Sequence, residues 1–246
     1  MRAVLVSSLR KLAPVVLLHL IRRILCFFDW DPWQATSWAQ EGEDRILQRI
    51  FERQSSGFYV DVGAHHPKRF SNTYLFYRRG WSGINVDAAP GSMDAFRKLR
   101  PRDTNLELGV ALDSRWLDFF VFTEPALNGF SYELSQHRVR CNNKCKILDV
   151  KRVKTEPLSS ILERCLPENR VIDFLTIDVE GFDLEVLKSN DWQRFRPKYV
   201  LVESLESSLH TLFESDLAEF MRECGYSIYA KCVNTIFFKK HDVPHK

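Results

Sequence analysis

The feature of this sequence that most constrains its fold is a short apolar run that ends near an acidic residue or a glycine and recurs along the chain. The clearest examples are residues 58–63, 83–87 and 172–179, each five to eight residues long. Continuous apolar runs of this length, closed by turn residues, are typical of strands buried on both faces. Segments with helical spacing of apolar residues lie between them. The sequence therefore predicts an α/β fold in which a mostly parallel sheet carries helices on both faces.

The same alternation continues to the end of the chain. Helices are predicted at 43–51, 71–79, 90–99, 157–165, 183–189 and 215–224. Strands are predicted at 58–63, 83–87, 106–112, 117–122, 172–179 and 199–203, and a hairpin at 226–238 adds an antiparallel edge. Residues 123–146 are polar and lack periodicity, which indicates a loop over the site. Trp81, Trp116 and Trp192 are expected in the core, because side chains of this size dominate buried contacts.

The positive charge of the chain is concentrated at its beginning. Residues 1–30 hold five Lys or Arg and one Asp, a net charge of +4, so the formal charge of +3 leaves −1 for residues 31–246. A nucleic-acid-binding domain is expected to carry its basic excess in the folded body, since contacts to phosphates supply most of its affinity. We therefore expect no nucleic-acid partner.

Residues 1–36 are predicted to be an extension of a single domain at 37–246. The apolar run 12–21 is shorter than the roughly 20 residues that a membrane span needs, and no small-residue cleavage site follows it. The segment is interpreted either as a peripheral contact with the inner face of a membrane or as a terminal helix that packs on the body or is partly disordered. Six sparse cysteines indicate reduced thiols, so the protein is predicted to be cytoplasmic.

Candidate binding residues stand where the predicted strands end, because ligands of open parallel sheets lie outside the carboxyl ends of the strands. Asp61 and Gly63 close one strand and Asp87 closes the next, which is an arrangement typical of nucleoside binding. The turn at Gly63 lacks the further glycines of a dinucleotide site, and the chain has no Gly-Lys-Ser/Thr phosphate loop. A ligand with a ribose and no phosphates remains, and S-adenosylmethionine fits this description.

Several blocks of the sequence resemble the FkbM family of S-adenosylmethionine-dependent methyltransferases. They are SWAQEGEDRIL (37–47), FYVDVGAHHP (58–67), SNTYLFYRRGWSGINVDAAPGSM (71–93), RPRDTNLELGVAL (100–112) and IDFLTIDVEGFDLEVLKSNDW (172–192). The resemblance implies a class I methyltransferase (Rossmann-like) fold with a mostly parallel seven-stranded sheet. It also implies O-methylation, with a sugar hydroxyl of a glycan, glycolipid or glycosylated natural product as the expected acceptor.

The resemblance also assigns roles to residues at the strand ends. It places the methionine end of the cofactor against Asp61, Gly63 and Ala64, the ribose at Asp87, the adenine near Val110 and Ala111, and Asp178 with Glu180 at the floor of the site. Phe130 and Tyr132 of the predicted loop are candidates for stacking on a sugar.

A non-catalytic binding module with this fold is the main alternative function. A nicotinamide-dependent oxidoreductase is disfavoured by the single-glycine turn.

Methyl transfer to a sugar hydroxyl needs a base that removes the proton as the new bond forms. We expect Glu180 or His66 to be that base and Asp178 to orient the cofactor or the acceptor. Structural roles are the alternative, since Glu180 could cap the following helix and a histidine of the turn could make only local hydrogen bonds. A divalent metal held by Asp178, Glu180 and Glu203 could acidify the hydroxyl instead, although we favour a site without metal.

Overall fold

The computed structural model describes residues 17, 19, 20, 23, 33–142, 144–204 and 208–241. The chain separates into two units, Met1–Thr36 and Ser37–Lys246, and the sheets of the protein belong to the second. The interpretations made for residues 1–36 fall almost entirely outside the described residues. In the part of the chain that the structure describes, no helix combines the length and the apolar character needed to cross a bilayer.

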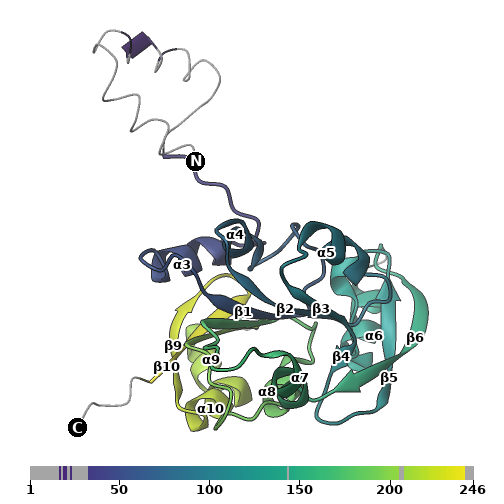
Figure 1. Cartoon of the computed structure of the whole chain (residues 1–246). Coiled ribbons are helices and arrows are strands. Elements are labelled where there is room, and N and C mark those ends of the chain that lie inside the picture. The colour runs from purple at the N-terminus through teal and green to yellow at the C-terminus, as the bar shows by residue number, and fades with distance from the viewer. Residues whose placement is uncertain are drawn as a thin grey trace. The chain divides into compact units, whose positions relative to one another are not determined.

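A seven-stranded sheet forms the centre of the second unit (Figure 1). Its spatial order is β3 (Thr104–Glu107), β2 (Ser82–Asp87), β1 (Phe58–Val62), β7 (Phe174–Ile177), β8 (Tyr199–Glu203), β10 (Thr235–Lys240) and β9 (Tyr226–Lys231). The first five of these strands pair in parallel, and β10 runs antiparallel to both β8 and β9. This order confirms the predicted class I methyltransferase fold, including its antiparallel C-terminal hairpin.

The order of the strands places a ligand site at the end of β1. From β1 the chain proceeds to β2 and β3 on one side, and it later returns to β7 on the other side of β1. Ligands of open α/β sheets bind at such a switch point, outside the carboxyl ends of the strands. In the register of the sheet, Val62 lies level with both Val86 and Ile177, so the three strands end together.

Helices cover both faces of the sheet (Figure 1). One face carries α3 (Glu43–Ile50), α4 (Tyr74–Arg78) and α5 (Met93–Leu99), and the other carries α7 (Leu158–Cys165), α8 (Asp183–Lys188) and α10 (Asp216–Glu223). Strand β1 shows why, because successive side chains point to opposite faces. Phe58, Val60 and Val62 pack in the core under α7 and α8, whereas Tyr59 packs in the core under α3 and α4.

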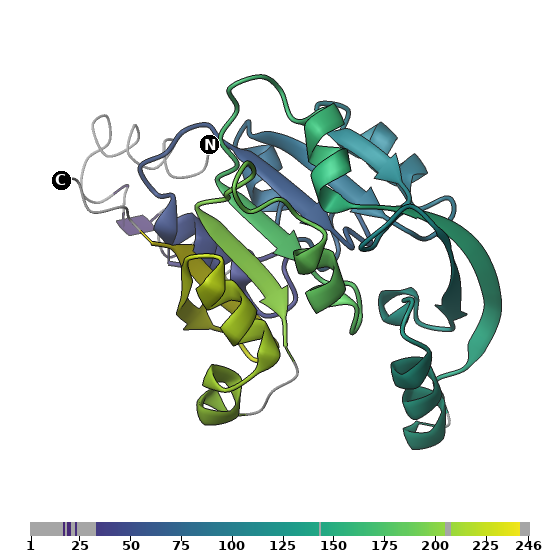
Figure 2. The same cartoon turned by 90° about the horizontal axis from the view of Figure 1, so that it is seen from below.

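A second, three-stranded sheet has the order β4 (Gly109–Val110), β6 (Ile147–Glu156) and β5 (Trp116–Phe122). With the intervening residues, β5 and β6 form an antiparallel arm (residues 116–156) that extends beside the main sheet, at the right of Figure 2. The predicted strand 106–112 was wrong as one element, because the chain turns at Leu108 and β3 and β4 belong to different sheets. The predicted strand 117–122 is β5, but it pairs outside the main sheet.

The prediction of a loop at 123–146 was also wrong. This segment holds a 3₁₀ turn, η1 (Pro125–Leu127), and the helix α6 (Tyr132–Cys141). The Ser131 side chain caps α6 by accepting a hydrogen bond from the backbone N–H of Leu134 at 3.2 Å. The helix lacks apolar periodicity because only Ser135 of its residues is buried. Two more elements were not predicted, β6 and the short helix α9 (Leu209–Phe213).

Most of the predicted core is found. Trp81 and Trp192 are buried, but Trp116 is 58% exposed, so its prediction as a core residue was wrong. It lies at the start of β5, opposite Lys154 of β6, and most residues of β6 are also exposed. The five described cysteines, Cys141, Cys145, Cys165, Cys224 and Cys232, are all free thiols.

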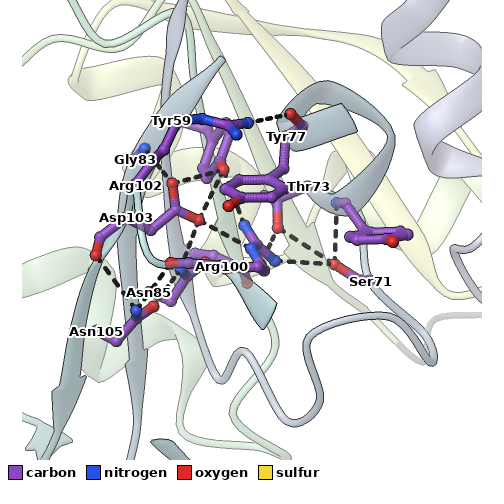
Figure 3. A network of polar contacts seen from close by, with 12 residues as sticks. Tyr59, Ser71, Thr73, Tyr77, Gly83, Asn85, Arg100, Arg102, Asp103 and Asn105 are labelled. Carbon is purple, nitrogen blue, oxygen red and sulfur yellow. Dashed lines mark hydrogen bonds and ion pairs between the residues drawn. The ribbon is translucent and has the colours of Figure 1, made fainter. Parts of the chain in front are cut away.

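A fully buried ion pair links three strands of the main sheet to α5 (Figure 3). Arg100 donates to Asp103 at 2.8 Å and to the hydroxyl of Tyr59 on β1 at 2.9 Å. Asp103 in turn accepts from the backbone N–H of Gly83 and the amide of Asn85, both on β2 and both at 3.0 Å. Both charged groups therefore have hydrogen-bonding partners in place of water, as a buried ion pair requires.

The network continues toward the end of β1. Arg100 contacts the hydroxyl of Ser71 at 3.4 Å, Ser71 lies 3.2 Å from the hydroxyl of Thr73, and Thr73 donates to Asp61 at 2.7 Å. A continuous chain of polar contacts thus connects the edge of the sheet with the carboxylate of Asp61, one residue before the end of β1. Figure 3 shows the part of this chain from Arg100 through Ser71 to Thr73.

Replacing Arg100 tests the contribution of this network. Arg100→Met leaves Asp103 as an uncompensated buried charge, so we expect a loss of about 3–5 kcal/mol in the free energy of unfolding. Denaturant unfolding measures it. Arg97→Gln is the matched control, since its ion pair with Asp94 is exposed and such pairs contribute about 1 kcal/mol or less. Equal losses in the two variants would contradict a stabilising role for the buried pair.

Candidate active site

A cavity of about 450 Å³ lies at the carboxyl ends of β1, β2 and β7, where the strand order predicts a ligand. Its walls combine apolar side chains of both sheets with polar groups at the strand ends. The apolar part includes Val62, Val86, Leu108, Val110, Phe119 and Phe130, and the polar part includes His65, His66, Arg69, Asp87, Lys151, Asp178 and Glu180. A mixed lining of this kind suits a ligand with a flat apolar group and several hydrogen-bonding groups.

Gly63 is required where β1 and β7 meet at the cavity. Its φ is +83°, and a Cβ atom at this position would lie 1.8 Å from the backbone oxygen of Asp178. The backbones of the two strands therefore approach each other as closely as they can. The absence of a side chain here also leaves the end of β1 open toward the cavity.

Asp87 holds the turn that follows β1. One of its carboxylate oxygens accepts from the backbone N–H of His65 at 2.8 Å, and the other accepts from the backbone N–H of Ala89 at 2.8 Å. Burial raises the pKa of Asp87, although these hydrogen bonds oppose the shift. Each carboxylate oxygen has a second lone pair, so Asp87 can accept from a ligand and shape the turn at the same time.

The turn after β7 brings Glu180 into the cavity in an unusual conformation. Glu180 has φ +58° and Gly181 has φ +86°, both in the left-handed region. Asp183, the first residue of α8, stabilises this turn by accepting from the backbone N–H of Gly181 at 3.1 Å and of Val179 at 3.3 Å. A left-handed glutamate costs on the order of 1–3 kcal/mol, and such residues cluster at functional sites.

Arg138 of the arm forms an ion pair with Glu180. The same guanidinium donates to the backbone oxygen of Leu127 at 3.0 Å, so it is held by the arm while it contacts the turn after β7. Burial raises the pKa of Glu180, and the charge of Arg138 opposes this shift. The pair fixes the direction of the Glu180 carboxylate and connects the arm to the main sheet.

Three carboxylates meet at the ends of β7 and β8, and two of them, Asp178 and Glu180, line the cavity. Asp178, Glu180 and Glu203 each offer an oxygen within 4.8 Å of the others, with Asp178 exposed and the two glutamates half-buried. Asp178 and Glu203 also face a small hollow lined by Glu41 and Glu43. This crowding of negative charge has direct consequences for protonation.

Desolvation raises the pKa of Glu203 to about 8, and the charge of Glu180 adds to the shift. The pKa of Asp178 is raised as well, by desolvation and by the negative charges of Glu203 and Glu180. Asp178 nevertheless remains open to the cavity. Near neutral pH the cluster therefore holds at least one proton that it would lose on moderate alkalinisation.

The hydrogen bonds of His66 argue against its role as a base. Its Nδ1 accepts from the backbone N–H groups of Lys68 at 3.1 Å and Arg69 at 2.9 Å. The ring proton of the neutral form must then lie on Nε2, which leaves no nitrogen free to accept a second proton from a ligand. Burial also lowers the pKa of His66, so the ring is a neutral donor. The alternative from the sequence, a turn histidine with local hydrogen bonds, describes it better.

A protein-family model described as the methyltransferase FkbM domain matches residues 61–228 of the sequence, more than half of the chain. The chain belongs to the FkbM methyltransferase family. The family that the sequence blocks resemble is thereby confirmed. None of the curated proteins compared with the chain matches it.

Solved structures with a similar arrangement are distant from this FkbM protein. A precorrin-6y methyltransferase of Geobacter metallireducens has 12% identity and a TM-score of 0.43, with 83% of this chain and 90% of that chain covered. A methyltransferase of Geobacter sulfurreducens has 11% identity and a TM-score of 0.42, with 98% and 96% covered. A TehB-like SAM-dependent methyltransferase of Corynebacterium glutamicum has 10% identity and a TM-score of 0.41, with 91% and 96% covered.

The structure brings most of the predicted site residues of the FkbM domain to one cavity. Those that line it are Gly63, His66, Asp87, Val110, Asp178 and Glu180. Those that do not are Asp61, Ala64 and Ala111, all of them buried. Strand alternation explains the first of these, because Asp61 points toward α4 and accepts from Thr73. Burial raises the pKa of Asp61 to about 6, with Thr73 opposing the shift.

Sequence reasoning missed three residues that shape the site. Arg138 and Lys151 belong to the arm, whose position beside the main sheet no local pattern reveals. Asp183 had a signal, since an acid at the start of a helix just after an acidic turn often accepts from the backbone of that turn.

The residues present fit S-adenosylmethionine. Asp87 has unused acceptor capacity at the cavity wall, and the apolar surface beside it includes Val86, Leu108 and Val110. The cradle at Gly63 admits a ligand close to the backbone. These residues would hold the ribose and the adenine, as the sequence predicts for Asp87 and Val110.

Glu203 links the protonation of the cavity to stability. A carboxyl group with a raised pKa binds protons more tightly in the folded state, so its stabilising effect is complete below its unfolded pKa of 4.5 and is lost as the pH rises through about 8. We expect Glu203→Gln to flatten the fall in the free energy of unfolding over this interval and to stabilise the protein near pH 9. Denaturant unfolding across this pH range checks it, with exposed Glu168→Gln as the control. An unchanged slope in Glu203→Gln would contradict the raised pKa.

Proposed function

We propose that this FkbM protein is an S-adenosylmethionine-dependent O-methyltransferase whose acceptor is a hydroxyl group of a saccharide. The observation that carries the proposal is the cluster of Asp178, Glu180 and Glu203, of which Asp178 and Glu180 line the cavity. A hydroxyl oxygen must lose its proton as it forms a bond to carbon, and the carboxylates of the cavity lining offer a proton acceptor. When bound, S-adenosylmethionine supplies the methyl group on a positively charged sulfur.

Asp178 is the residue that we assign as the general base. It ends β7, lines the cavity and is the exposed member of the cluster, so a bound hydroxyl can reach it. Its raised pKa brings it closer to the operating pH, where a carboxylate is a more effective base. Glu203 lies beside Asp178 in this cluster, and its pKa of about 8 means that it is the neutral neighbour of Asp178 near pH 7.

Glu180 changes its role from the one expected from the sequence. Its ion pair with Arg138 fixes the direction of the carboxylate, which suits a residue that orients a ligand by accepting hydrogen bonds. His66, as a neutral donor in the same lining, suits a hydrogen bond to the acceptor or the cofactor. Geometry thus separates the proton acceptor from the groups that align the reactants, and alignment is a large part of the catalysis of such displacements.

Aromatic and amide groups beside these acids support a saccharide acceptor. Phe130 and Asn128 line the cavity together with Gly129, in the segment that connects η1 with α6. Phe130 packs against Phe119 with ring centroids 5.0 Å apart, so its orientation is fixed. An aromatic face beside carboxylate and amide groups matches the alternating apolar and hydroxyl surfaces of a sugar ring. Tyr132, the other stacking candidate, is 59% exposed outside this lining.

Asp178→Asn tests the assignment of the base. The amide cannot accept the proton, so we expect kcat to fall by about 10²–10⁴-fold while S-adenosylmethionine still binds. In the unchanged protein, kcat should rise with pH through the range in which Asp178 and Glu203 lose their shared proton. Methyl transfer from labelled cofactor to a panel of saccharides measures the rate, and calorimetry measures cofactor binding, with Glu168→Gln as the control.

A variant Asp178→Asn with undiminished kcat would assign the base elsewhere. Absence of cofactor binding by the unchanged protein would instead favour the alternative of a binding module that has the fold without the reaction.

The same three acids are the ligand set of a metal-assisted alternative. Carboxylate oxygens within 4.8 Å of one another suit a hard divalent cation. Arg138, however, already supplies a positive charge to Glu180, one of the three ligands. We therefore expect kcat to stay the same, within about twofold, after dialysis against EDTA. A loss of activity that Mg²⁺ or Mn²⁺ restores would contradict this expectation and make the cluster a metal site.

A further inference from the structure

The near-neutral charge of residues 31–246 hides a strongly basic segment. Residues 138–155 of the arm hold seven Lys or Arg and a single acid, Asp149. The rest of the domain is correspondingly acidic, most visibly at the floor of the cavity. A neutral total charge therefore does not exclude an anionic partner for the arm.

Many of these cations lack a partner among the described residues. Arg140, Lys144, Lys146 and Lys151 are exposed, and no carboxylate of the described chain pairs with them. Arg152 and Lys154 form only long ion pairs, 3.6 Å to Asp118 and 3.7 Å to Glu156, and Arg152 also donates to the backbone oxygen of Trp116 at 3.2 Å. Exposed pairs of this kind contribute little, so they leave most of the positive charge of residues 138–155 available to a partner. The other acids of the arm, Asp118, Glu124, Glu133 and Glu156, lie outside this segment and reduce the net charge of residues 116–156 to +2.

Apolar side chains are exposed on the same arm. Trp116 is 58% exposed, Leu148 64% and Val150 47%. The register of β5 and β6 places Trp116 opposite Lys154, Asp118 opposite Arg152 and Phe120 opposite Val150. One face of the ribbon therefore carries exposed Trp116 and Val150 with Arg152 and Lys154, together with a single acid, Asp118, and the buried Phe120. Phe119 and Lys151 share the other face and line the cavity.

We propose that the arm is a docking surface for an anionic lipid bilayer. Lys and Arg side chains attract the negative headgroups, and Trp, Leu and Val side chains among them can sink below the headgroups. A soluble polyanion such as nucleic acid would satisfy the charges but would leave these apolar side chains in water. The combination therefore favours the bilayer.

Docking by this face has a geometric consequence for the cavity. The ribbon is two strands wide, and its opposite face is part of the cavity lining. The arm on the surface would thus hold the cavity within a short distance of the headgroups. This proposal does not depend on methyl transfer, since it concerns binding of the protein alone.

The test measures binding of the full chain to vesicles of phosphatidylcholine with and without phosphatidylglycerol, by co-sedimentation. The variant Arg140→Gln/Lys144→Gln/Lys146→Gln removes three exposed cations from the far end of the arm, none of them in the cavity lining. The control Arg53→Gln/Lys98→Gln/Lys188→Gln removes three exposed cations elsewhere. We expect the arm variant to bind at least about tenfold more weakly and the control to bind like the unchanged protein.

Residues 1–30 could also bind vesicles and conceal the effect. Both triple variants are therefore repeated in a second background, a full chain in which the five cations of residues 1–30 are replaced by Gln. These are Arg2, Arg10, Lys11, Arg22 and Arg23. A second variant, Leu148→Gln/Val150→Gln, should weaken the part of the binding that persists at high salt, because that part comes from apolar insertion.

Two results would overturn the proposal. One is equal vesicle binding by the arm variant and the control in both backgrounds. The other is binding of the arm to a DNA duplex, lost in the arm variant, without binding to anionic vesicles. Unchanged thermal unfolding of the variants confirms that a loss of binding does not reflect misfolding.

Discussion

The domain depends on one buried ion pair, Arg100 with Asp103, which joins strands that apolar contacts hold together elsewhere in the sheet. Three parallel strands, β1, β2 and β3, meet around it, and each provides a polar group that needs a partner once water is excluded. On β3 this group is the amide of Asn105, which donates to the backbone oxygens of Arg100 and Asp103, both at 3.2 Å. A buried charge without such partners would be costly. The ion pair is stable only when these partners are in place, and the partners lose their hydrogen bonds when the pair is removed. The pair therefore favours one particular arrangement of the strands at this edge of the sheet.

At the carboxyl ends of the strands, the domain holds carboxylates that are mostly without cationic partners. Asp178, Glu180 and Glu203 have one guanidinium among them, and their mutual repulsion is relieved by protonation instead of by ion pairs. The buried Asp103 is thus fully paired with Arg100, whereas Asp178 and Glu203 at the other end of the strands have no ion-pair partner among the described residues. Perturbed carboxylates in a cleft are the usual mark of a site where protons move.

The sequence predicts the parts of the domain that are specified locally. Buried parallel strands are continuous apolar runs, so β1, β2, β7 and β8 were found, and their ends identified Gly63, Asp87 and Asp178. Of the arm, only β5 was found as a strand. β6 was missed because it is exposed along most of its length and pairs with β5 across the whole of α6. The contact of the arm with the site, Arg138 with Glu180, joins residues far apart in the chain, and neither residue carries a sign of the other. Asp61 was wrongly predicted to line the cavity because the side chain of an acid near the end of a strand can point to either face of the sheet. Its hydrogen bond with Thr73, a residue distant in sequence, holds it on the face away from the cavity.

The close approach of Gly63 to the backbone of Asp178 has a consequence for how the protein is made. This contact requires β1 and β7 to pair, and their register joins Tyr59 with Phe174 across most of the domain. Closing so long a loop is entropically expensive and slow compared with local pairing. During synthesis the cavity therefore cannot exist until β7 has left the ribosome, so no early fragment of the chain can hold the ligand. A bound ligand would then stabilise only chains in which β1 and β7 have already paired. The ligand would stabilise the folded protein late and would not guide the early steps of folding.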